Sequence, residues 1–410
     1  MKKINILKSL VKKKLWIDDP EKIKPYLYEQ RGNLRGSSPL LLKPSTSLEV
    51  SKILKICNKF KIPIIPQGGR TGLCGGTIPN KKGNQVLLTT EKMNKVIDID
   101  KNNFSITVQS GCKLNFIKEA AKEINRFFPI SLPSEGNCTI GGNIATNAGG
   151  SSVLRYGMTK DLIEGLEIVM PNGDIINGIK DIKKDNRSFD LQFLHIGSEG
   201  TLGIVTAAKL KLFPMIKNKA MAIVAFNNVE NSINFLSLLK NSCFQYLSSY
   251  ELTSNIGLNL IKKHFSNILI PFNNQYAWYV IFELSTYDNK DLNKEIVNIV
   301  NKAINTNIIV DALIPQNIKQ YNNIWNTRNL LNEAQKINGP SIKHDISIPI
   351  SKIPEFLKKA ELKLSNFSKN NLLAFGHLAD GNLHYNISKP YDMNNLDFKK
   401  LHKKVNKIIF

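Results

Sequence analysis

The stretch that decides the fold is residues 66–76, PQGGRTGLCGG, which follows a short apolar run at 62–65. The run predicts a short buried strand, and the glycines predict a loop that leaves it. Glycine permits positive φ and lets backbone amides approach a ligand closely. Because successive amides in such turns form concavities that bind anions, we expect an anionic ligand here.

Two further glycine-rich clusters occupy residues 136–150 and 197–203, and Ser, Thr or Asn stands beside the glycines of each. A single loop of this kind is more often a plain turn, but three together favour a ligand site. The Gly-Lys-Ser/Thr of a nucleotide-triphosphate loop is absent, as is G-x-G-x-x-G after the first strand. The loops therefore disfavour both a P-loop fold and a Rossmann fold.

The flanking sequence supports one unit at 35–215. Thr46 and Glu49 have the spacing of a capping box, which predicts the start of a helix. Residues 168–176 contain Pro-Asn-Gly-Asp, a strong hairpin signal. Apolar periodicity predicts strands at 85–88, 96–99, 104–108 (half-buried, from its alternation) and 201–213, and a helix at 114–124.

The pattern of apolar residues changes beyond Pro214. Strand-like runs at 221–226 and 278–284 alternate with helix-like runs at 232–239 and 294–304. This alternation predicts an α+β domain with a mostly antiparallel sheet.

The charge is strongly basic, +23 over 410 residues, yet only seven of the 56 basic residues are Arg. The Lys are spread along the chain without the clustered Arg and interleaved aromatics of a nucleic-acid groove, so we expect no nucleic-acid partner. No apolar run approaches the roughly 20 residues of a spanning helix, and residues 1–16 lack the features of a signal peptide. We expect a cytoplasmic protein, with weak, peripheral attraction to the inner face of an anionic membrane left open.

The five cysteines are odd in number and show no C-x-x-C spacing, which disfavours a disulfide framework and a zinc site. We expect buried or semi-buried thiols in a reducing compartment. They are Cys57, Cys74, Cys112, Cys138 and Cys243.

A second motif is residues 376–386, GHLADGNLHYN, after an apolar strand expected at 372–375. An isolated pair of histidines is more often two unrelated imidazoles. Here, however, Asp-Gly-Asn at 380–382 supplies a turn that can fold His384 back toward His377. Converging neutral imidazoles are good ligands for a divalent metal.

Arg328 stands out in a chain that otherwise uses Lys. Its planar fork can hold a carboxylate through two parallel hydrogen bonds, which Lys cannot copy. A surface ion pair is the alternative interpretation.

Four stretches, at 66–72, 141–150, 155–157 and 197–203, resemble the FAD-binding signatures of the vanillyl-alcohol-oxidase-type (PCMH-type) flavoproteins. From about residue 25 to its end the chain is most similar to the D-2-hydroxy acid dehydrogenases. That group includes enzymes acting on D-2-hydroxyglutarate and D-lactate, and the FAD subunit of glycolate oxidase; it shares the motif at 376–384.

The resemblance implies an α+β fold in which a PCMH-type FAD-binding domain of two subdomains precedes a ferredoxin-like antiparallel-sheet substrate domain. We accordingly expect an N-terminal helical segment at 1–34, the FAD-binding domain at 35–215 and an FAD-linked oxidase C-terminal domain at 216–410.

The resemblance also implies FAD, which we expect to be noncovalent because the first loop contains no His and Cys74 lies beyond its core. The residues expected to bind FAD are Pro66, Gln67, Gly68, Gly69, Arg70, Thr71, Gly72, Leu73, Ser134, Gly141, Gly142, Asn143, Thr146, Gly149, Gly150, Tyr156, Glu199, Gly200, Gly203 and Ile204.

The activity that the resemblance implies is oxidation of a D-2-hydroxy acid (D-2-hydroxyglutarate, D-lactate or glycolate class) to the 2-oxo acid by hydride transfer to flavin N5. His377 and His384 would be catalytic and would ligate a divalent metal, with zinc the first candidate. Arg328 and Lys343 would hold the substrate carboxylate, with Asn332 and Asn386 also at the substrate. Asn332 replaces a hydroxyl residue of the hydroxyglutarate dehydrogenases, which leaves the preference for a second carboxylate open.

The partners implied are a small 2-hydroxy acid and an electron acceptor, either an electron-transfer flavoprotein, a quinone or a cytochrome; a homodimer is left open. Relatives continue past the helix expected at 397–409 with a Ser-Ala-Glu-His-Gly segment whose Glu ligates the metal and whose His is the base. Glu-His-Gly does not occur in this sequence. We therefore keep three alternatives: a shortened reading frame, a separate polypeptide that supplies the segment, or an inactive FAD-binding protein or subunit.

Overall fold

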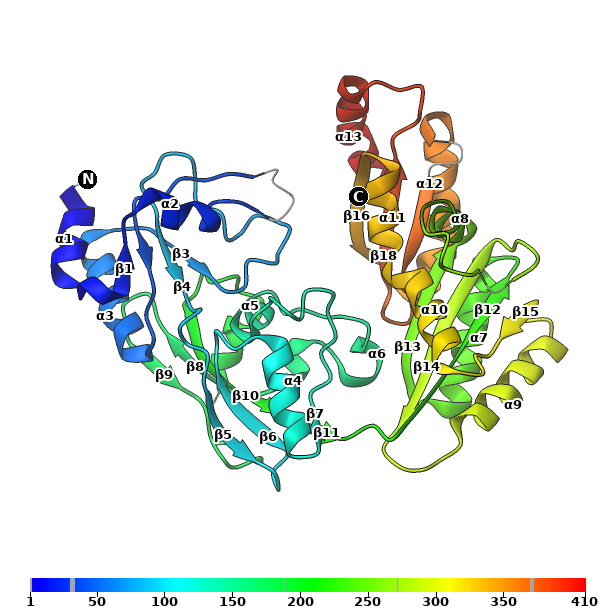
Figure 1. The fold of residues 1–410 in the computed structure, drawn as a ribbon, viewed down its shortest axis with the longest axis horizontal. Coiled ribbons are helices and arrows are strands. Elements are labelled where there is room, and N and C mark those ends of the chain that lie inside the picture. Colours follow the sequence, from blue (N-terminus) through cyan, green and yellow to red (C-terminus); the bar gives the residue numbers. More distant parts are fainter. Residues whose placement is uncertain (1, 30–33, 188, 271, 369–371) are drawn as a thin grey trace. The chain divides into compact units, whose positions relative to one another are not determined.

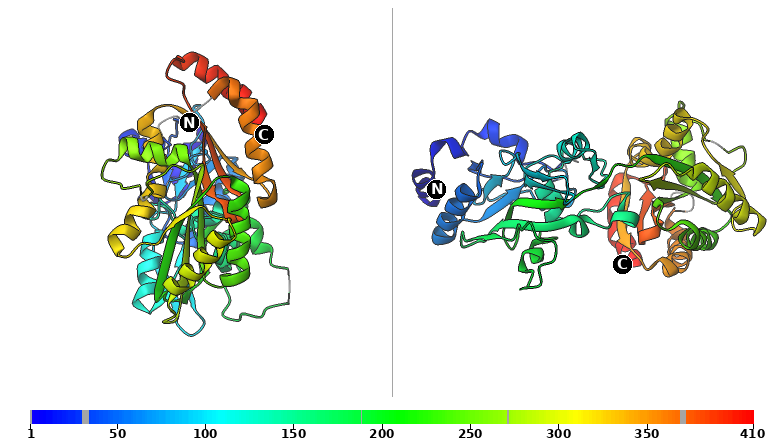
Figure 2. Two further views of the ribbon diagram at one scale, coloured as in Figure 1. Left: turned by 90° about the vertical axis from the view of Figure 1, so that its right-hand side faces the viewer. Right: turned by 90° about the horizontal axis from the view of Figure 1, so that it is seen from below.

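The computed structural model describes residues 2–29, 34–187, 189–270, 272–368 and 372–410. They form two compact units, which Figures 1 and 2 draw as ribbons. The first unit contains residues up to 152 together with 156–215, and the second contains residues 153–155 and 216–410.

The first unit is built on two sheets (Figure 1). Its smaller sheet has the order β1-β2-β4-β3, with parallel pairing among β2, β4 and β3. Its larger sheet is antiparallel, in the order β5-β6-β10-β8-β9, and a short ladder pairs β11 with β7. The strands are β1 Trp16–Ile17, β2 Leu41–Leu42, β3 Ile64–Gln67, β4 Val86–Thr89, β5 Val96–Asp100, β6 Ser105–Gln109, β7 Arg126–Phe127, β8 Ile163–Val169, β9 Ile175–Asn177, β10 Ile204–Lys211 and β11 Phe213–Pro214. The helices are α1 Lys2–Leu10, α2 Pro20–Ile23, α3 Ser47–Phe60, α4 Leu114–Glu123, α5 Ile140–Ala145 and α6 Val153–Tyr156, the last crossing the boundary between the units.

Helix α3 begins where the capping residues predicted, because Thr46 accepts a hydrogen bond from the amide of Glu49. It ends at Lys61, whose φ of 51° is left-handed, and the amide of Ile62 closes onto the carbonyl of Cys57. Residue 62 therefore still belongs to the helix end. The buried strand expected at 62–65 was wrong in its start and its burial: β3 begins at Ile64 and is mostly half-buried.

The hairpin predicted at 168–176 is confirmed, with the amide of Met170 bonded to the carbonyl of Asp174 and Gly173 at φ 87°. The half-buried strand expected at 104–108 was wrong in its burial. Residues 105–108 of β6, which lies between β5 and β10, are all buried, so neither face of the strand is open to solvent.

The second unit contains a single seven-stranded sheet in the order β15-β12-β14-β13-β17-β18-β16, and all its strand pairs are antiparallel. This agrees with the mostly antiparallel sheet that the sequence predicted. Its strands are β12 Asn218–Phe226, β13 Leu247–Ser254, β14 Trp278–Thr286, β15 Asp311–Leu313, β16 Ser341–Ser347, β17 Leu372–His377 and β18 Asn382–Ser388. Its helices are α7 Val229–Cys243, α8 Asn255–His264, α9 Leu292–Asn305, α10 Ile318–Asn329, α11 Leu331–Asn338, α12 Ile353–Ser368 and α13 Asn395–Ile409.

Helices cover both faces of this sheet. One face packs with α7, α9, α12 and α13 in the largest apolar cluster. The other packs with α8, α10 and α11 in two smaller clusters. Alternate residues of each strand therefore serve different layers, and the second face carries the polar residues considered below.

Four cysteines are buried and all five are free thiols, but the expectation was wrong for Cys74, which is exposed. It lies in the loop at 72–76, whose glycines provide no side chains to cover it.

Candidate functional site

Thr139 joins the first two glycine-rich loops. Its Oγ1 accepts hydrogen bonds from the amide of Gly69, at 3.2 Å, and from the amide of Gly142, at 3.4 Å. The second bond is the N-cap of α5. We did not single out Thr139 from the sequence, although a threonine directly before a helix start was the available signal.

The glycines are required because the chain segments approach too closely for side chains. A Cβ at Gly68 would lie 2.4 Å from Thr139 Oγ1, and one at Gly69 would lie 2.2 Å from the carbonyl oxygen of Asn137. Gly150 has φ 139°, and its Cβ would meet the carbonyl oxygen of Ser131 at 2.1 Å.

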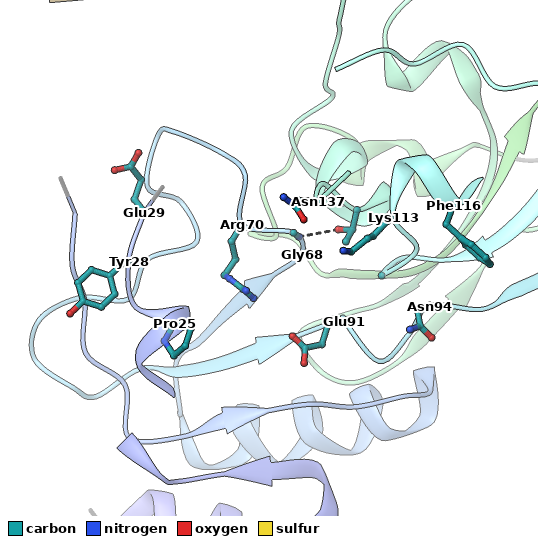
Figure 3. Close-up of a pocket in the computed structure, with 13 residues that line it drawn as sticks. Pro25, Tyr28, Glu29, Gly68, Arg70, Glu91, Asn94, Lys113, Phe116 and Asn137 are labelled. Carbon is teal, nitrogen blue, oxygen red and sulfur yellow. Dashed lines mark hydrogen bonds between the residues drawn. The ribbon is translucent and has the colours of Figure 1, made fainter. Parts of the chain in front are cut away.

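A cavity of about 800 Å³ opens beside these loops (Figure 3). Of the residues predicted to bind FAD, Gly68, Gly69 and Arg70 line it. Within the described residues, the amides at 70–72 donate to no backbone carbonyl, and Arg70 is left-handed at φ 56°. The cavity lies within the usual range of about 300–1,000 Å³ for small-molecule sites. The amide of Arg70, which lines it and donates to no described backbone carbonyl, fits a pyrophosphate oxygen. The residues present therefore fit FAD.

One wall of this cavity is charged, and it combines Arg70, which the sequence predicted, with Glu91, which it did not reveal. Figure 3 shows Arg70 and Glu91 on this wall. Glu91 accepts a hydrogen bond from the hydroxyl of Tyr26, at 2.7 Å, and pairs with Lys43. Burial alone would raise the pKa of Glu91, but Lys43 and Tyr26 hold it below its usual value. These residues come from separate segments, so no spacing in the sequence connects them.

The third glycine-rich loop docks on α5. The amides of Gly197 and Glu199 donate to the carbonyls of Ile144, at 3.0 Å, and Ala145, at 2.8 Å. Beside it lies a second cavity of about 400 Å³, and the predicted residues that line it are Pro66, Gly200, Gly203 and Ile204. The structure thus gathers all three loops around α5 and β3.

Other residues predicted to bind FAD have contacts within the protein. Gln67 anchors its loop through Nε2 to the carbonyls of Tyr26 and Thr77, and Tyr156 packs between the rings of Phe127 and Phe213. The remaining positions are Thr71, Gly72 and Leu73 on the first loop, Ser134, Gly141, Gly142, Asn143, Thr146, Gly149 and Gly150 around α5, and Glu199 on the third loop.

In the second unit, one sheet face gathers the second motif. Glu251 on β13 lies opposite His377 on β17, and Phe375 on β17 lies opposite His384 on β18. Directly opposed residues of antiparallel strands share a face. The left-handed turn at Gly381, with φ 81°, reverses the chain, and the two imidazole centroids lie 6.0 Å apart.

The next strand adds polar residues to the same face. On β16, Asp345 lies opposite His384, and Lys343 lies opposite Asn386. The side chains of Lys343 and Asp345 are exposed, whereas Asn386 is buried. The face therefore passes from a buried interior at β13 and β17 to a solvated edge at β16.

Glu251 is the buried centre of this face. Its Oε2 accepts a hydrogen bond from Arg328 Nε at 2.7 Å, and its Oε1 contacts His377 Nδ1 in a short hydrogen bond. Only 2% of the Glu251 side chain and 12% of that of Arg328 are exposed, so the surface ion pair considered for Arg328 was wrong. The sequence did not point to Glu251, which lies 77 residues from Arg328 and 126 from His377.

The pKa values of the two histidines are shifted in opposite directions. Burial alone would raise the pKa of Glu251, but Arg328 and His377 lower it to about 2. Burial would lower the pKa of His377, and the Glu251 carboxylate raises it above its ordinary value. Burial lowers the pKa of His384 to about 4. At neutral pH His384 is therefore neutral, beside a negatively charged Glu251.

The asparagines predicted at the substrate differ in their surroundings. Asn332 is exposed on α11. Asn386 is held within the protein: its Nδ2 donates to Gln335 Oε1 at 3.0 Å, and its Oδ1 accepts from the amide of His344 at 3.1 Å. His344 itself lies between the carbonyl of Tyr385 and the side chain of Asn406, as expected of a structural residue.

The divalent metal predicted from the resemblance lacks a complete ligand set. Within the described residues, no group of three or more His, Cys, Asp or Glu side chains is arranged so that it could hold a metal ion. Zinc sites use four protein ligands when structural and three when catalytic. His377 and His384 supply at most two, so these residues do not by themselves fit such a site.

The described part of the chain contains no helix long and apolar enough to cross a membrane.

The fold and the glycine cradle define an FAD-binding oxidoreductase. Residues 39–178 match the model of the FAD binding domain, and residues 215–409 match that of the C-terminal domain of FAD linked oxidases. The chain is 30% identical to D-2-hydroxyglutarate dehydrogenase of Arabidopsis thaliana, covering 94% of this chain and 68% of that protein. It is 32% identical to the Danio rerio enzyme of the same name, covering 91% and 69%. Both relatives are named as mitochondrial. The chain belongs to the FAD-linked oxidase family that includes the D-2-hydroxyglutarate dehydrogenases.

Solved structures agree on the fold. Alkyldihydroxyacetonephosphate synthase aligns with a TM-score of 0.74 at 17% identity, covering 98% of this chain and 78% of that one. p-Cresol methylhydroxylase aligns with a TM-score of 0.72 at 19% identity, covering 99% and 86%. The PCMH-type α+β fold implied by the resemblance is therefore confirmed.

Proposed function

We propose that the protein oxidises a D-2-hydroxy acid to the 2-oxo acid. The observation that carries the proposal is the buried network of Arg328, Glu251 and His377 beside a neutral His384, in a chain of this family. FAD, when bound, supplies the hydride acceptor at its N5. We propose residues 35–215 as the FAD-binding domain and 216–410 as the substrate domain, after an N-terminal segment at 1–34.

Arg328 and Lys343 bind the substrate carboxylate in this proposal. Within the described residues, the guanidinium of Arg328 makes one hydrogen bond to the protein, through Nε, which leaves its terminal nitrogens for a carboxylate. Lys343 adds a positive charge on the same sheet face. Asn332 and Asn386 remain candidates for further contacts with the substrate, the latter through small shifts of its amide.

The proposed proton acceptor is His384. Asp345 Oδ1 lies 3.4 Å from its Nδ1, which favours a proton on Nδ1 and a lone pair on Nε2. That lone pair can take the hydroxyl proton of the substrate. His377, whose Nδ1 proton is directed at Glu251, presents the lone pair of its Nε2 as a second acceptor for the same proton.

The decisive experiment is an anaerobic titration of the purified yellow protein with D-2-hydroxyglutarate, D-lactate and glycolate. We expect the flavin absorbance to bleach with at least one acid and the 2-oxo acid to appear in equal amount. The L-enantiomers of 2-hydroxyglutarate and lactate are the matched controls; glycolate is achiral and has none. An FAD-loaded protein that bleaches with none of the acids would contradict the proposal.

The finer proposals have separate tests. FAD is noncovalent, so acid precipitation should leave the flavin in the supernatant. A divalent metal at the two imidazoles would need a further ligand beyond them, and it would appear as stoichiometric metal on elemental analysis. Cell fractionation tests the cytoplasmic location, and vesicle binding tests a weak association with the membrane surface. Assays with an electron-transfer flavoprotein, a quinone and a cytochrome test the electron acceptor, and size-exclusion chromatography tests the homodimer.

A further inference from the structure

We infer that Glu251 is a positioning residue that orients the carboxylate clamp and the catalytic imidazole together. The inference rests on the proposed function, because Arg328 and His377 are the residues it orients. The carboxylate lies on β13, inside the sheet, and only 2% of its side chain is exposed. Each of its two oxygens contacts one of these two residues.

One oxygen sets the imidazole of His377. Contact of Oε1 with Nδ1 fixes a proton on Nδ1 and leaves Nε2 as the nitrogen turned away from Glu251. A histidine tautomer is set by the hydrogen bond that its other nitrogen makes.

The other oxygen sets the guanidinium of Arg328. The bond to Oε2 uses Nε, and the ring of Phe375 lies 5.0 Å from the guanidinium carbon. These contacts restrain the plane of the guanidinium group, so its two terminal nitrogens keep a fixed orientation toward the substrate carboxylate.

Only a carboxylate can satisfy both neighbours, because both are donors. Glutamine offers one acceptor oxygen, and its NH₂ group would face the N–H of either Arg328 or His377. In Glu251→Gln, either the guanidinium rotates or the proton of His377 moves to Nε2. Aspartate keeps the charge but is one methylene shorter, so it can reach one neighbour at a time.

The chain offers a matched control in Glu283 on β14. Its carboxylate is also buried. Glu283 lies opposite Ser249 on β13, two residues before Glu251 on the same strand. Glu283 bonds to Ser248, Tyr321 and Lys219 rather than to Arg328 or His377. Glu283→Gln therefore tests the loss of a buried carboxylate in the same sheet.

The experiment compares FAD-loaded wild type, Glu251→Gln, Glu251→Asp and Glu283→Gln. We expect Glu251→Gln to raise KM and lower kcat, with a loss of about 100-fold in kcat/KM, because misplacement by about 1 Å costs that much. Glu251→Asp should recover part of the loss, and Glu283→Gln should stay within about threefold of wild type. Equal losses in Glu251→Gln and Glu283→Gln, or no loss in Glu251→Gln, would overturn the inference.

A second readout does not depend on turnover. Nitrogen-15 spectra of the six histidines should show a proton on Nδ1 of His377 in wild type. In Glu251→Gln this signal should shift or broaden, and in Glu283→Gln it should not. A wild type without turnover would contradict the proposed function alone, and the spectra would still decide the role of Glu251. If Glu251→Gln does not fold, the same spectra of Glu251→Asp decide it, and an unchanged His377 signal there would contradict the inference.

Discussion

The hydroxyl of Thr139 accepts a hydrogen bond from the amide of Gly69, 3.2 Å away and 70 positions earlier in the chain. The same oxygen caps helix α5 through the amide of Gly142. One hydroxyl thus ties together the start of a helix and the loop expected to hold the FAD pyrophosphate.

Thr139→Ala should weaken FAD binding and lower stability together. Loss of an N-cap costs about 1 kcal/mol, and the released loop no longer presents its amides as a set. Asn228→Ala removes the N-cap of α7 in the other unit and is the matched control. Flavin fluorescence titration should show a larger dissociation constant for Thr139→Ala only; equal affinities in the two variants would contradict the linkage.

Gly69→Ala and Gly72→Ala should differ sharply in the FAD-free protein. A Cβ at Gly69 would lie 2.2 Å from a backbone oxygen, whereas one at Gly72 would have nothing within 4 Å. We expect Gly69→Ala to destabilise by about 1–3 kcal/mol, as overpacking does, and Gly72→Ala to change stability by less than about 0.5 kcal/mol. Thermal melts without FAD test this. A Gly72→Ala that is stable but binds FAD weakly would place the cofactor against residue 72, whereas unchanged FAD affinity would argue against that contact.

Arg328→Lys should raise KM for the 2-hydroxy acid by about tenfold or more, since Lys keeps the charge but not the planar fork. Steady-state kinetics measure this. Arg187→Lys is the control, because Arg187 pairs with Asp185 and its side chain is exposed. A KM for Arg328→Lys within twofold of wild type would argue that Arg328 does not bind the carboxylate.

The stability of the protein should fall as the pH drops from about 6.5 to about 4 because of His384. Burial lowers the pKa of this imidazole from 6.5 to about 4 in the folded chain. Between these values the unfolded chain takes up a proton that the folded chain refuses, so the stabilisation is complete above pH 6.5 and is lost toward pH 4. Denaturant unfolding at several pH values should show a shallower slope for His384→Asn. His402→Asn, exposed on α13, should keep the wild-type slope; a wild-type slope in both variants would contradict the assignment.

Local signals predicted the helix start at Thr46 and the hairpin at Gly173, because capping and turn chemistry involve neighbours in the sequence. Burial was harder to predict. The alternation at 104–108 suggested one solvent-exposed face, but residues 105–108 are all buried, so both faces of β6 are covered. Only tertiary packing decides that burial.

For the second site, the turn at Gly381 was readable because His377 and His384 stand seven residues apart. Gln335 was not, although it is fully buried and accepts a hydrogen bond from Asn386. A glutamine on a helix carries no sign of its tertiary neighbour.

The sequence alone determined the glycine loops, the family resemblance and the histidine turn, since backbone freedom and short turns depend on residues close together in the chain. Only the tertiary structure decided that Thr139 joins two of those loops and that Glu251 lies between Arg328 and His377. The physical reason is that these bonds join residues 70 to 126 positions apart. Strand register and loop docking bring them within hydrogen-bonding distance, and a spacing pattern along the chain carries no record of either.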